Sequence, residues 1–139
     1  MIATETEIAY LAGLLDGEGY ISIVKTGKHH APILNITNTD LALLLWVQMR
    51  FGGALYRVLA GKAGDRAKDC HRLQWNSTAE IARILVMVQP YLVAKGKQAE
   101  LVIEFIALPG GKGKKLSQET IEARGDLHLS AKSLNKKGR

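Results

Sequence analysis

The first helical segment of the chain carries an unusual second row of side chains. Over residues 5–16, apolar side chains recur at three- and four-residue spacing, the pattern of a helix with one buried face. The second row is small and comprises Ala9, Ala12, Gly13 and Gly17. Ala9, Gly13 and Gly17 are four residues apart and share one helix face, which another helix can approach closely. The chain has one such segment, so we expect the partner helix to come from a second copy.

The rest of the chain predicts strands in pairs, each pair preceded by a helix. The predicted strands are 20–25, 31–39, 54–59 and 69–76, and the predicted helices are 41–51, 77–88, 90–108 and one or two short helices after Ser117. Residues 26–30 and 61–68 read as polar turns, which favour antiparallel hairpins. The sequence therefore predicts an α+β fold in one domain, 1–139, with helices on one face of a four-stranded antiparallel sheet. Residues 109–116 are expected to form a basic, Gly-rich linker to the C-terminal helices.

The other face of this sheet is predicted to be polar. On the expected register it presents Tyr20, Ser22, Asn35, Thr37, Arg57, Arg72 and Gln74. Such side chains can read base edges in a DNA groove. A sheet face that is polar only because it meets water would show the same pattern.

Charge favours a polyanionic partner. The 139 residues include 19 Lys and Arg against 13 Asp and Glu, a formal net charge of +6, which points to nucleic acid before membrane. Basic side chains of the two predicted hairpins are candidate phosphate contacts: Lys25, Lys28, His29 and His30 in the first, and Lys62, Arg66 and Lys68 in the second.

Cysteine content and hydropathy restrict the class of protein further. The single cysteine, Cys70, excludes an internal disulfide framework or a cysteine-based zinc site. No run of about 18 apolar residues predicts a membrane helix, and the polar N-terminus is unlike a signal peptide. We expect a soluble intracellular protein without membrane contact, in a compartment that the sequence does not specify.

One segment carries a family resemblance. Residues 11–19 read LAGLLDGEG and resemble the LAGLIDADG motif, differing at Leu15, Gly17 and Glu18. Residues 89–101, QPYLVAKGKQAEL, resemble the PYL…K-x-QA-x-L segment of the same family, and 134–138, LNKKG, its LN-x-KG ending. The resemblance extends over about residues 5 to 138 and is to LAGLIDADG homing endonucleases of the single-motif, homodimeric type.

The resemblance implies a fold and a function. The sheet would be a saddle-shaped platform in the DNA major groove, and an intron-encoded homodimer would cut a long, near-palindromic duplex site. Glu18 and the Gly17 carbonyl would bind the metal, Asn38 would order water, and Lys97 would stabilise charge or polarise water. The cofactor would be Mg²⁺ or another divalent cation such as Mn²⁺, with Ca²⁺ binding without supporting cleavage. Asp16 would lie at the dimer interface rather than on the metal.

The chemistry of the residues agrees with this resemblance. Two-fold symmetry would bring two Glu18 carboxylates together, and bound divalent cations would remove their repulsion. Magnesium prefers oxygen ligands and keeps several waters, so one carboxylate per subunit with DNA phosphates suffices. Such ions generate a hydroxide nucleophile and stabilise the leaving oxygen of a phosphodiester.

Two features leave alternatives open. Asn38 stands where the single-motif family often has the longer Gln, and Asp40, Leu41 and Ala42 occupy positions where a basic residue is frequent. The same fold could serve as an RNA maturase, with RNA as its partner, or as a DNA-binding protein that does not cleave. A basic interaction protein with a coincidental motif is an alternative of a different class.

Overall fold

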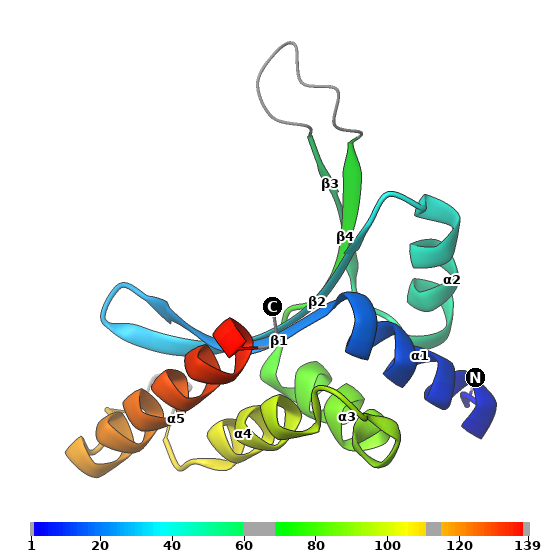
Figure 1. The fold of residues 1–139 in the computed structure, drawn as a ribbon. Coiled ribbons are helices and arrows are strands. Elements are labelled where there is room, and N and C mark those ends of the chain that lie inside the picture. The colour runs from blue at the N-terminus through cyan, green and yellow to red at the C-terminus, as the bar shows by residue number, and fades with distance from the viewer. Residues whose placement is uncertain (1, 60–68, 111–114, 138–139) are drawn as a thin grey trace.

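A computed structural model describes residues 2–59, 69–110 and 115–137 of the chain. The helices are α1 (Glu5–Glu18), α2 (Leu41–Phe51), α3 (Thr78–Val88), α4 (Gly96–Ala107) and α5 (Gln118–Lys137), with a short 3₁₀ helix, η1 (Gln89–Tyr91). The strands are β1 (Gly19–Thr26), β2 (His29–Asn38), β3 (Ala54–Val58) and β4 (Cys70–Trp75). The described strands form one antiparallel sheet in the order β1-β2-β4-β3, which confirms the predicted α+β fold. The β1–β2 hairpin and the β3–β4 pair extend in different directions, so the sheet is strongly curved (Figure 1).

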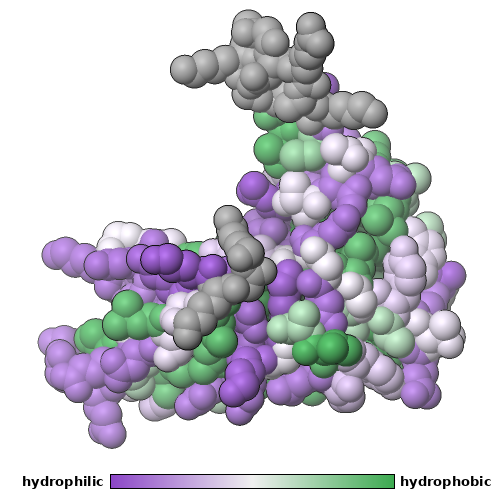
Figure 2. Space-filling model, viewed as in Figure 1, coloured by the Kyte–Doolittle hydropathy of each residue, from purple (hydrophilic) through white to green (hydrophobic). Residues whose placement is uncertain are grey.

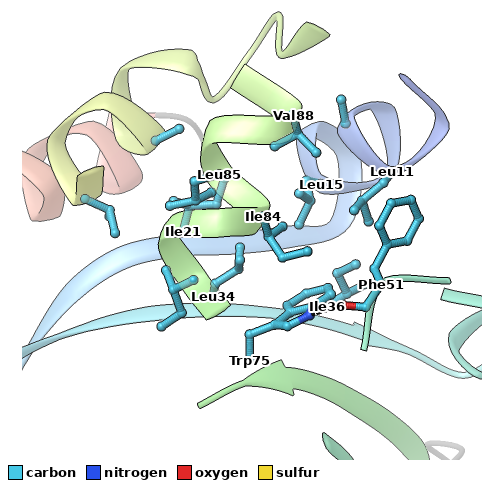
Figure 3. Packing of buried hydrophobic residues seen from close by; sticks show 14 of the residues in the cluster. Leu11, Leu15, Ile21, Leu34, Ile36, Phe51, Trp75, Ile84, Leu85 and Val88 are labelled. Carbon is cyan, nitrogen blue, oxygen red and sulfur yellow. Dashed lines mark hydrogen bonds between the residues drawn. The ribbon is translucent and has the colours of Figure 1, made fainter. Parts of the chain in front are cut away.

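The core lies between the sheet and the helices that cover one of its faces. Cross-strand pairing aligns Ile21, Leu34 and Trp75, all fully or almost fully buried (Figure 3). Leu11 and Leu15 of α1 pack into the same cluster. The Trp75 indole donates a hydrogen bond of 3.0 Å to the Phe51 carbonyl, which pairs the one polar atom of that ring inside the core.

Local sequence signals set where the helices begin. Thr4 caps α1 in a reciprocal capping box with Glu7, and Asp40 caps α2 by accepting the Leu43 N–H at 3.1 Å. Ser77 accepts the Glu80 N–H at 3.1 Å and begins α3, as its sequence position predicts. These caps fix the residue at which each helix begins.

The structure corrects the predicted end of the first helix and the predicted first turn. Helix α1 continues through Gly17 to Glu18 and ends at Gly19, where a Cβ would lie 2.8 Å from the Leu15 Cα. The first turn is only residues 27–28, because Gly27 adopts a φ of 63° that lets the chain reverse tightly. The predicted turn 61–68 lies outside the described residues, as do residues 111–114 of the predicted linker 109–116.

The helix predicted over 90–108 is divided in two. Residues 92–95 separate η1 from α4, since the N–H groups of residues 93–95 bond to a carboxylate of α1 described below. The segment after Ser117 is one helix of 20 residues rather than one or two short ones. Within the described ranges, no helix combines the length and apolar character needed to cross a membrane.

Helix α5 runs along the outer edge of β1 (Figure 1). The Asn135 amide donates to the Ile21 carbonyl at 3.1 Å, and His128 Nδ1 lies 2.7 Å from the Ile23 carbonyl oxygen. These side chains occupy carbonyls of β1 that a further strand would otherwise pair with. Helix α5 thereby covers the exposed edge of β1.

The contact between the first hairpin and α5 is expected to be sensitive to acid. The His30 ring lies tilted against the His128 ring, with ring centroids 4.9 Å apart. Burial lowers the pKa of His30, and Coulombic interactions with His128, Lys25, Arg124 and His29 lower it further. A lowered folded pKa means that the unfolded chain binds the proton more tightly. The contribution of His30 to stability is therefore present above about pH 6.5 and lost as pH falls through the folded pKa. Thermal unfolding of the wild type and of His30→Gln at pH 8 and pH 5 should show the advantage of His30 shrinking at pH 5; an unchanged difference would contradict this.

Candidate active site and nucleic-acid interface

The sheet face opposite the helices carries most of the predicted polar set. Tyr20 pairs with Asn35, Asn35 with Gln74, and Thr37 with Arg72, so these residues share one face. Two of the predicted contacts are not open to solvent, because Ser22 and Asn35 are only 3% and 7% exposed. Ser22 lines a groove between β1 and α5, together with Tyr20, Lys132 and Lys136.

Arg57 is a correction to the predicted face. It pairs with His71, next to the pair Leu55–Leu73, and so lies on the helix-covered side of the sheet. Its guanidinium bonds to Asp69 at 2.6 Å. The strand position on the polar face belongs to Tyr56, which is exposed and pairs with Arg72. Apolar Leu55, two residues before Arg57, was the sequence signal for this register.

The basic residues of the first hairpin divide between solvent and α5. Lys25, Lys28 and His29 are exposed, whereas His30 packs against α5. Hydrophilic side chains gather over this hairpin and again at the lower left of Figure 2, with a hydrophobic patch between them. Lys62, Arg66 and Lys68 lie outside the described residues.

The end of α1 brings Glu18 and Asn38 together. Glu18 is the last residue of the helix and is exposed, and the Asn38 side-chain amide donates a hydrogen bond to its carboxylate. The Asn38 side-chain oxygen accepts the Asp40 N–H at 2.8 Å, which fixes its orientation at the end of β2. The acid and the amide predicted from the resemblance are thus direct neighbours, from elements 20 residues apart.

Asp16 bonds to the turn before α4 of its own subunit. Its carboxylate accepts the N–H groups of Val93, Ala94 and Lys95 at 2.8, 3.0 and 2.9 Å. Both oxygens thus bond within the chain and need no partner across an interface, and the place of Asp16 at a dimer interface stays a prediction. Ala12 is wrongly assigned to that interface, because it is completely buried in the core.

A lysine other than the expected one reaches this end of α1. Lys95 Nζ donates to the carbonyl oxygens of Gly19 at 2.5 Å and Leu15 at 3.1 Å. Burial lowers the pKa of Lys95 from its ordinary value, and the Asp16 carboxylate acts in the opposite direction. Lys97 is exposed and lines a groove between α4 and α5 instead. Both lysines belong to the segment that resembles the family, and the sequence alone did not show which of the two turns toward α1.

The small residues of α1 leave an open strip on the subunit surface. Ala9, Gly13 and Gly17 are exposed, and a Cβ added at Gly13 or Gly17 would meet nothing within 4 Å. Neither glycine is therefore required by packing within the subunit. Tyr10 borders the strip and is 53% exposed, with its ring edge-on to Trp46 of α2.

The oxygen atoms at the end of α1 suit a hard divalent cation. Glu18 offers an exposed carboxylate, and Gly17 lies in the last helical turn, where backbone carbonyls lack intrahelical partners. Mg²⁺ takes oxygen ligands of this kind and retains waters. In the described part of the chain no three His, Cys, Asp or Glu side chains gather into a metal site. The Glu18 carboxylate and the Gly17 carbonyl could therefore supply some, but not all, of the ligands of a divalent cation.

Comparisons with known proteins bear on the fold. No protein-family model and no curated protein sequence matches the chain. Among solved structures, the homing endonuclease I-CvuI in complex with a DNA target is 21% identical over 88% of this chain and 95% of that one, with a TM-score of 0.58. The archaeal intron-encoded homing endonuclease I-Vdi141I complexed with DNA is 14% identical over 90% and 98%, with a TM-score of 0.58. The LAGLIDADG meganuclease I-AabMI bound to uncleaved DNA is 23% identical over 88% of this chain but only 44% of its own, with a TM-score of 0.68. The chain has the fold of LAGLIDADG homing endonucleases, which confirms the resemblance at the level of fold.

Proposed function

We propose that this chain is a site-specific DNA endonuclease that acts as a homodimer with divalent cations. The observation that carries the proposal is the position of Glu18. It is an exposed acid at the end of α1, at the margin of a polar sheet face and beside an open glycine strip. The shared fold with DNA-bound homing endonucleases supports this reading.

Two observations support a dimer. The chain matches 95% of the length of I-CvuI but only 44% of the length of I-AabMI, so it corresponds to one repeat of a larger chain. The strip formed by Ala9, Gly13 and Gly17 would let two α1 helices pack at close range. Pairing about a two-fold axis would place both Glu18 residues side by side and require a near-palindromic DNA site.

The residues at the end of α1 have distinct proposed roles. Glu18 and the Gly17 carbonyl would hold Mg²⁺ or Mn²⁺, and Ca²⁺ would occupy the site without supporting cleavage. A bound cation activates water and stabilises the leaving oxygen of a phosphodiester. Asn38 orients the Glu18 carboxylate. Lys95, rather than Lys97, would supply positive charge near the reacting phosphate.

DNA would lie along the polar face of the sheet. Tyr20, Thr37, Arg72 and Gln74 of the predicted set share that face with Tyr56. In the described residues the buried Arg72 Nε has no hydrogen-bond partner, which suits a contact to a bound group. Lys25, Lys28 and His29 would follow the backbone phosphates outward, with Lys62, Arg66 and Lys68 as candidates in the second hairpin. Residues 1–139 would act as one DNA-binding unit.

The proposal is tested by selection from a randomised duplex library. Purified protein is incubated with the library and Mg²⁺, and the cut ends are sequenced; bound duplexes are recovered separately in Ca²⁺. We expect one long, near-palindromic site, cut with staggered ends. Binding should weaken steeply with salt, with a log–log slope of about 0.9 per phosphate neutralised. If the protein neither cuts nor retains any sequence, the proposal is overturned.

A non-cleaving DNA-binding protein is the second candidate. The start of α2 favours this candidate. The Asp40 side chain is engaged in capping the helix, and the Ala42 side chain has no polar group that could bind a phosphate. In the library experiment, this candidate predicts one retained sequence in both Ca²⁺ and Mg²⁺ without cut ends. An RNA maturase would instead bind its intron RNA equally well after Glu18→Gln.

The two lysines of the α4 segment should differ in their effect on cleavage. Lys95→Met removes a partly buried cation that bonds to the Leu15 and Gly19 carbonyls at the end of α1, and we expect the single-turnover cleavage rate to fall by about 10²-fold or more. Lys97→Gln changes an exposed lysine in another groove and should leave the rate within about twofold, since exposed surface changes are usually nearly neutral. If instead Lys97→Gln lowered the cleavage rate and Lys95→Met did not, Lys97 would be the lysine that acts in cleavage.

A further inference from the structure

The turn before α4 is held from outside the helix. Lys95 is the N-cap residue of α4, and its side chain makes no capping hydrogen bond. The Asp16 carboxylate from α1 accepts three consecutive N–H groups of this turn, those of residues 93, 94 and 95. A carboxylate in this position also complements the positive end of the α4 dipole. Asp16 therefore supplies the anionic cap that α4 lacks locally.

The same turn returns a contact to α1. Lys95 Nζ donates to the carbonyls of Leu15 and Gly19, which flank Asp16 in sequence. Half-burying an ammonium is unfavourable unless it is bonded and paired with an opposite charge. Asp16 provides the opposite charge, and the carbonyls at the end of α1 provide acceptors. The Asp16 carboxylate of α1 therefore bonds to the turn, and the Lys95 ammonium of the turn bonds back to α1.

We infer that Asp16 is a positioning residue: by accepting three N–H groups it sets the turn that carries Lys95 and so holds the Lys95 ammonium against the Leu15 and Gly19 carbonyls at the end of α1. The link to cleavage rests on the proposed function, whereas the placement of Lys95 stands on the geometry of the subunit. Asp16 itself has both oxygens occupied and is not assigned to the metal or to DNA.

The two carboxylate oxygens are both needed for this role. One oxygen accepts the Val93 N–H and the other accepts the N–H groups of Ala94 and Lys95. In Asp16→Asn one oxygen becomes an amide nitrogen, which is a donor and cannot accept an N–H. Asp16→Ala removes all three bonds. A graded series, from wild type through Asn to Ala, is therefore expected in how firmly Lys95 is held.

The first experiment reads the position of Lys95 without using catalysis. Wild-type protein and both Asp16 variants are labelled with a small amine-reactive reagent, and Lys95 is compared with exposed Lys97 on the same peptide by mass spectrometry. We expect Lys95 to be labelled at least about fivefold more, relative to Lys97, in Asp16→Ala, with Asp16→Asn intermediate. Asp126→Asn on exposed α5 is the matched control and should not change the ratio. An unchanged ratio in all variants would overturn the inference.

The second experiment asks whether Asp16 acts through Lys95. Single-turnover cleavage and Ca²⁺-supported DNA binding are measured for Asp16→Ala, Lys95→Met and the double variant. We expect each single variant to lose cleavage with DNA affinity within about threefold of wild type, and the double variant to cleave no more slowly than Lys95→Met. Losses that multiply in the double variant would overturn the action through Lys95. If wild type cuts no DNA, the proposed function fails, and the labelling ratio alone decides whether Asp16 positions the lysine.

Discussion

Glu18→Gln is expected to abolish cleavage while leaving recognition of the DNA site intact. Glutamine has almost the same size as glutamate, and its side-chain oxygen can still accept the hydrogen bond from Asn38. The change therefore keeps the end of α1 in place and removes only the negative charge that would hold a divalent cation. Because changes around metal ligands already cost 10–100-fold, we expect loss of the ligand itself to lower the cleavage rate by more than about 10²-fold.

The measurement compares single-turnover cleavage in Mg²⁺ with DNA binding in Ca²⁺. Glu104→Gln, the same change at an exposed position of α4, is the matched control and should cleave like the wild type. A Glu18→Gln protein that cuts its site at the wild-type rate would exclude Glu18 as metal ligand. Loss of binding together with cleavage would mean that the charge serves the interface rather than the reaction.

The parts of this fold that were predictable from sequence depend on neighbouring residues. Alternation of apolar and polar side chains set the faces of β2 and β4, where Leu34, Leu73 and Trp75 are buried as their spacing predicts. Asp40 and Ser77 marked the starts of their helices because a cap acts within three residues. Side-chain alternation and helix caps were therefore enough to predict the order of the helices and strands, and with it the fold.

The parts that were not predictable depend on contacts far apart in the chain. Residues 92–95 are compatible with a helix by local pattern, but Asp16, 77 to 79 residues away, accepts the N–H groups of residues 93–95 and interrupts the predicted helix there. That contact decides that Lys95 rather than Lys97 turns toward α1. Ser22 has a polar-face position by register, yet it lies in a groove that α5 forms with β1. Glu18 and Asn38 were candidate site residues from the family resemblance, and the structure shows them hydrogen-bonded to each other. Lys95 became a candidate only from the tertiary structure.

Gly13→Leu is expected to convert the protein from a dimer into a folded monomer that does not cut DNA. Gly13 is exposed, and a side chain there meets nothing within its own subunit. Within the subunit the change should be neutral or stabilising, because glycine in a helix interior costs about 0.8–1 kcal/mol relative to good helix formers. Between subunits a leucine would hold the two α1 backbones apart at the point where close approach is needed.

The control for this variant is another helical glycine with free space around it. A Cβ at Gly125 of α5 also meets nothing within 4 Å, so Gly125→Leu makes the same chemical change away from the proposed interface. Light scattering should report a monomer for Gly13→Leu and a dimer for wild type and Gly125→Leu, with melting temperatures for both variants at or above that of the wild type. Cleavage should be lost only in Gly13→Leu, since one subunit alone offers a single Glu18 and half of the DNA-binding surface. If Gly13→Leu remained a dimer and still cut DNA, the two subunits would have to meet through a surface other than the α1 strip, and the two Glu18 carboxylates would not share one site.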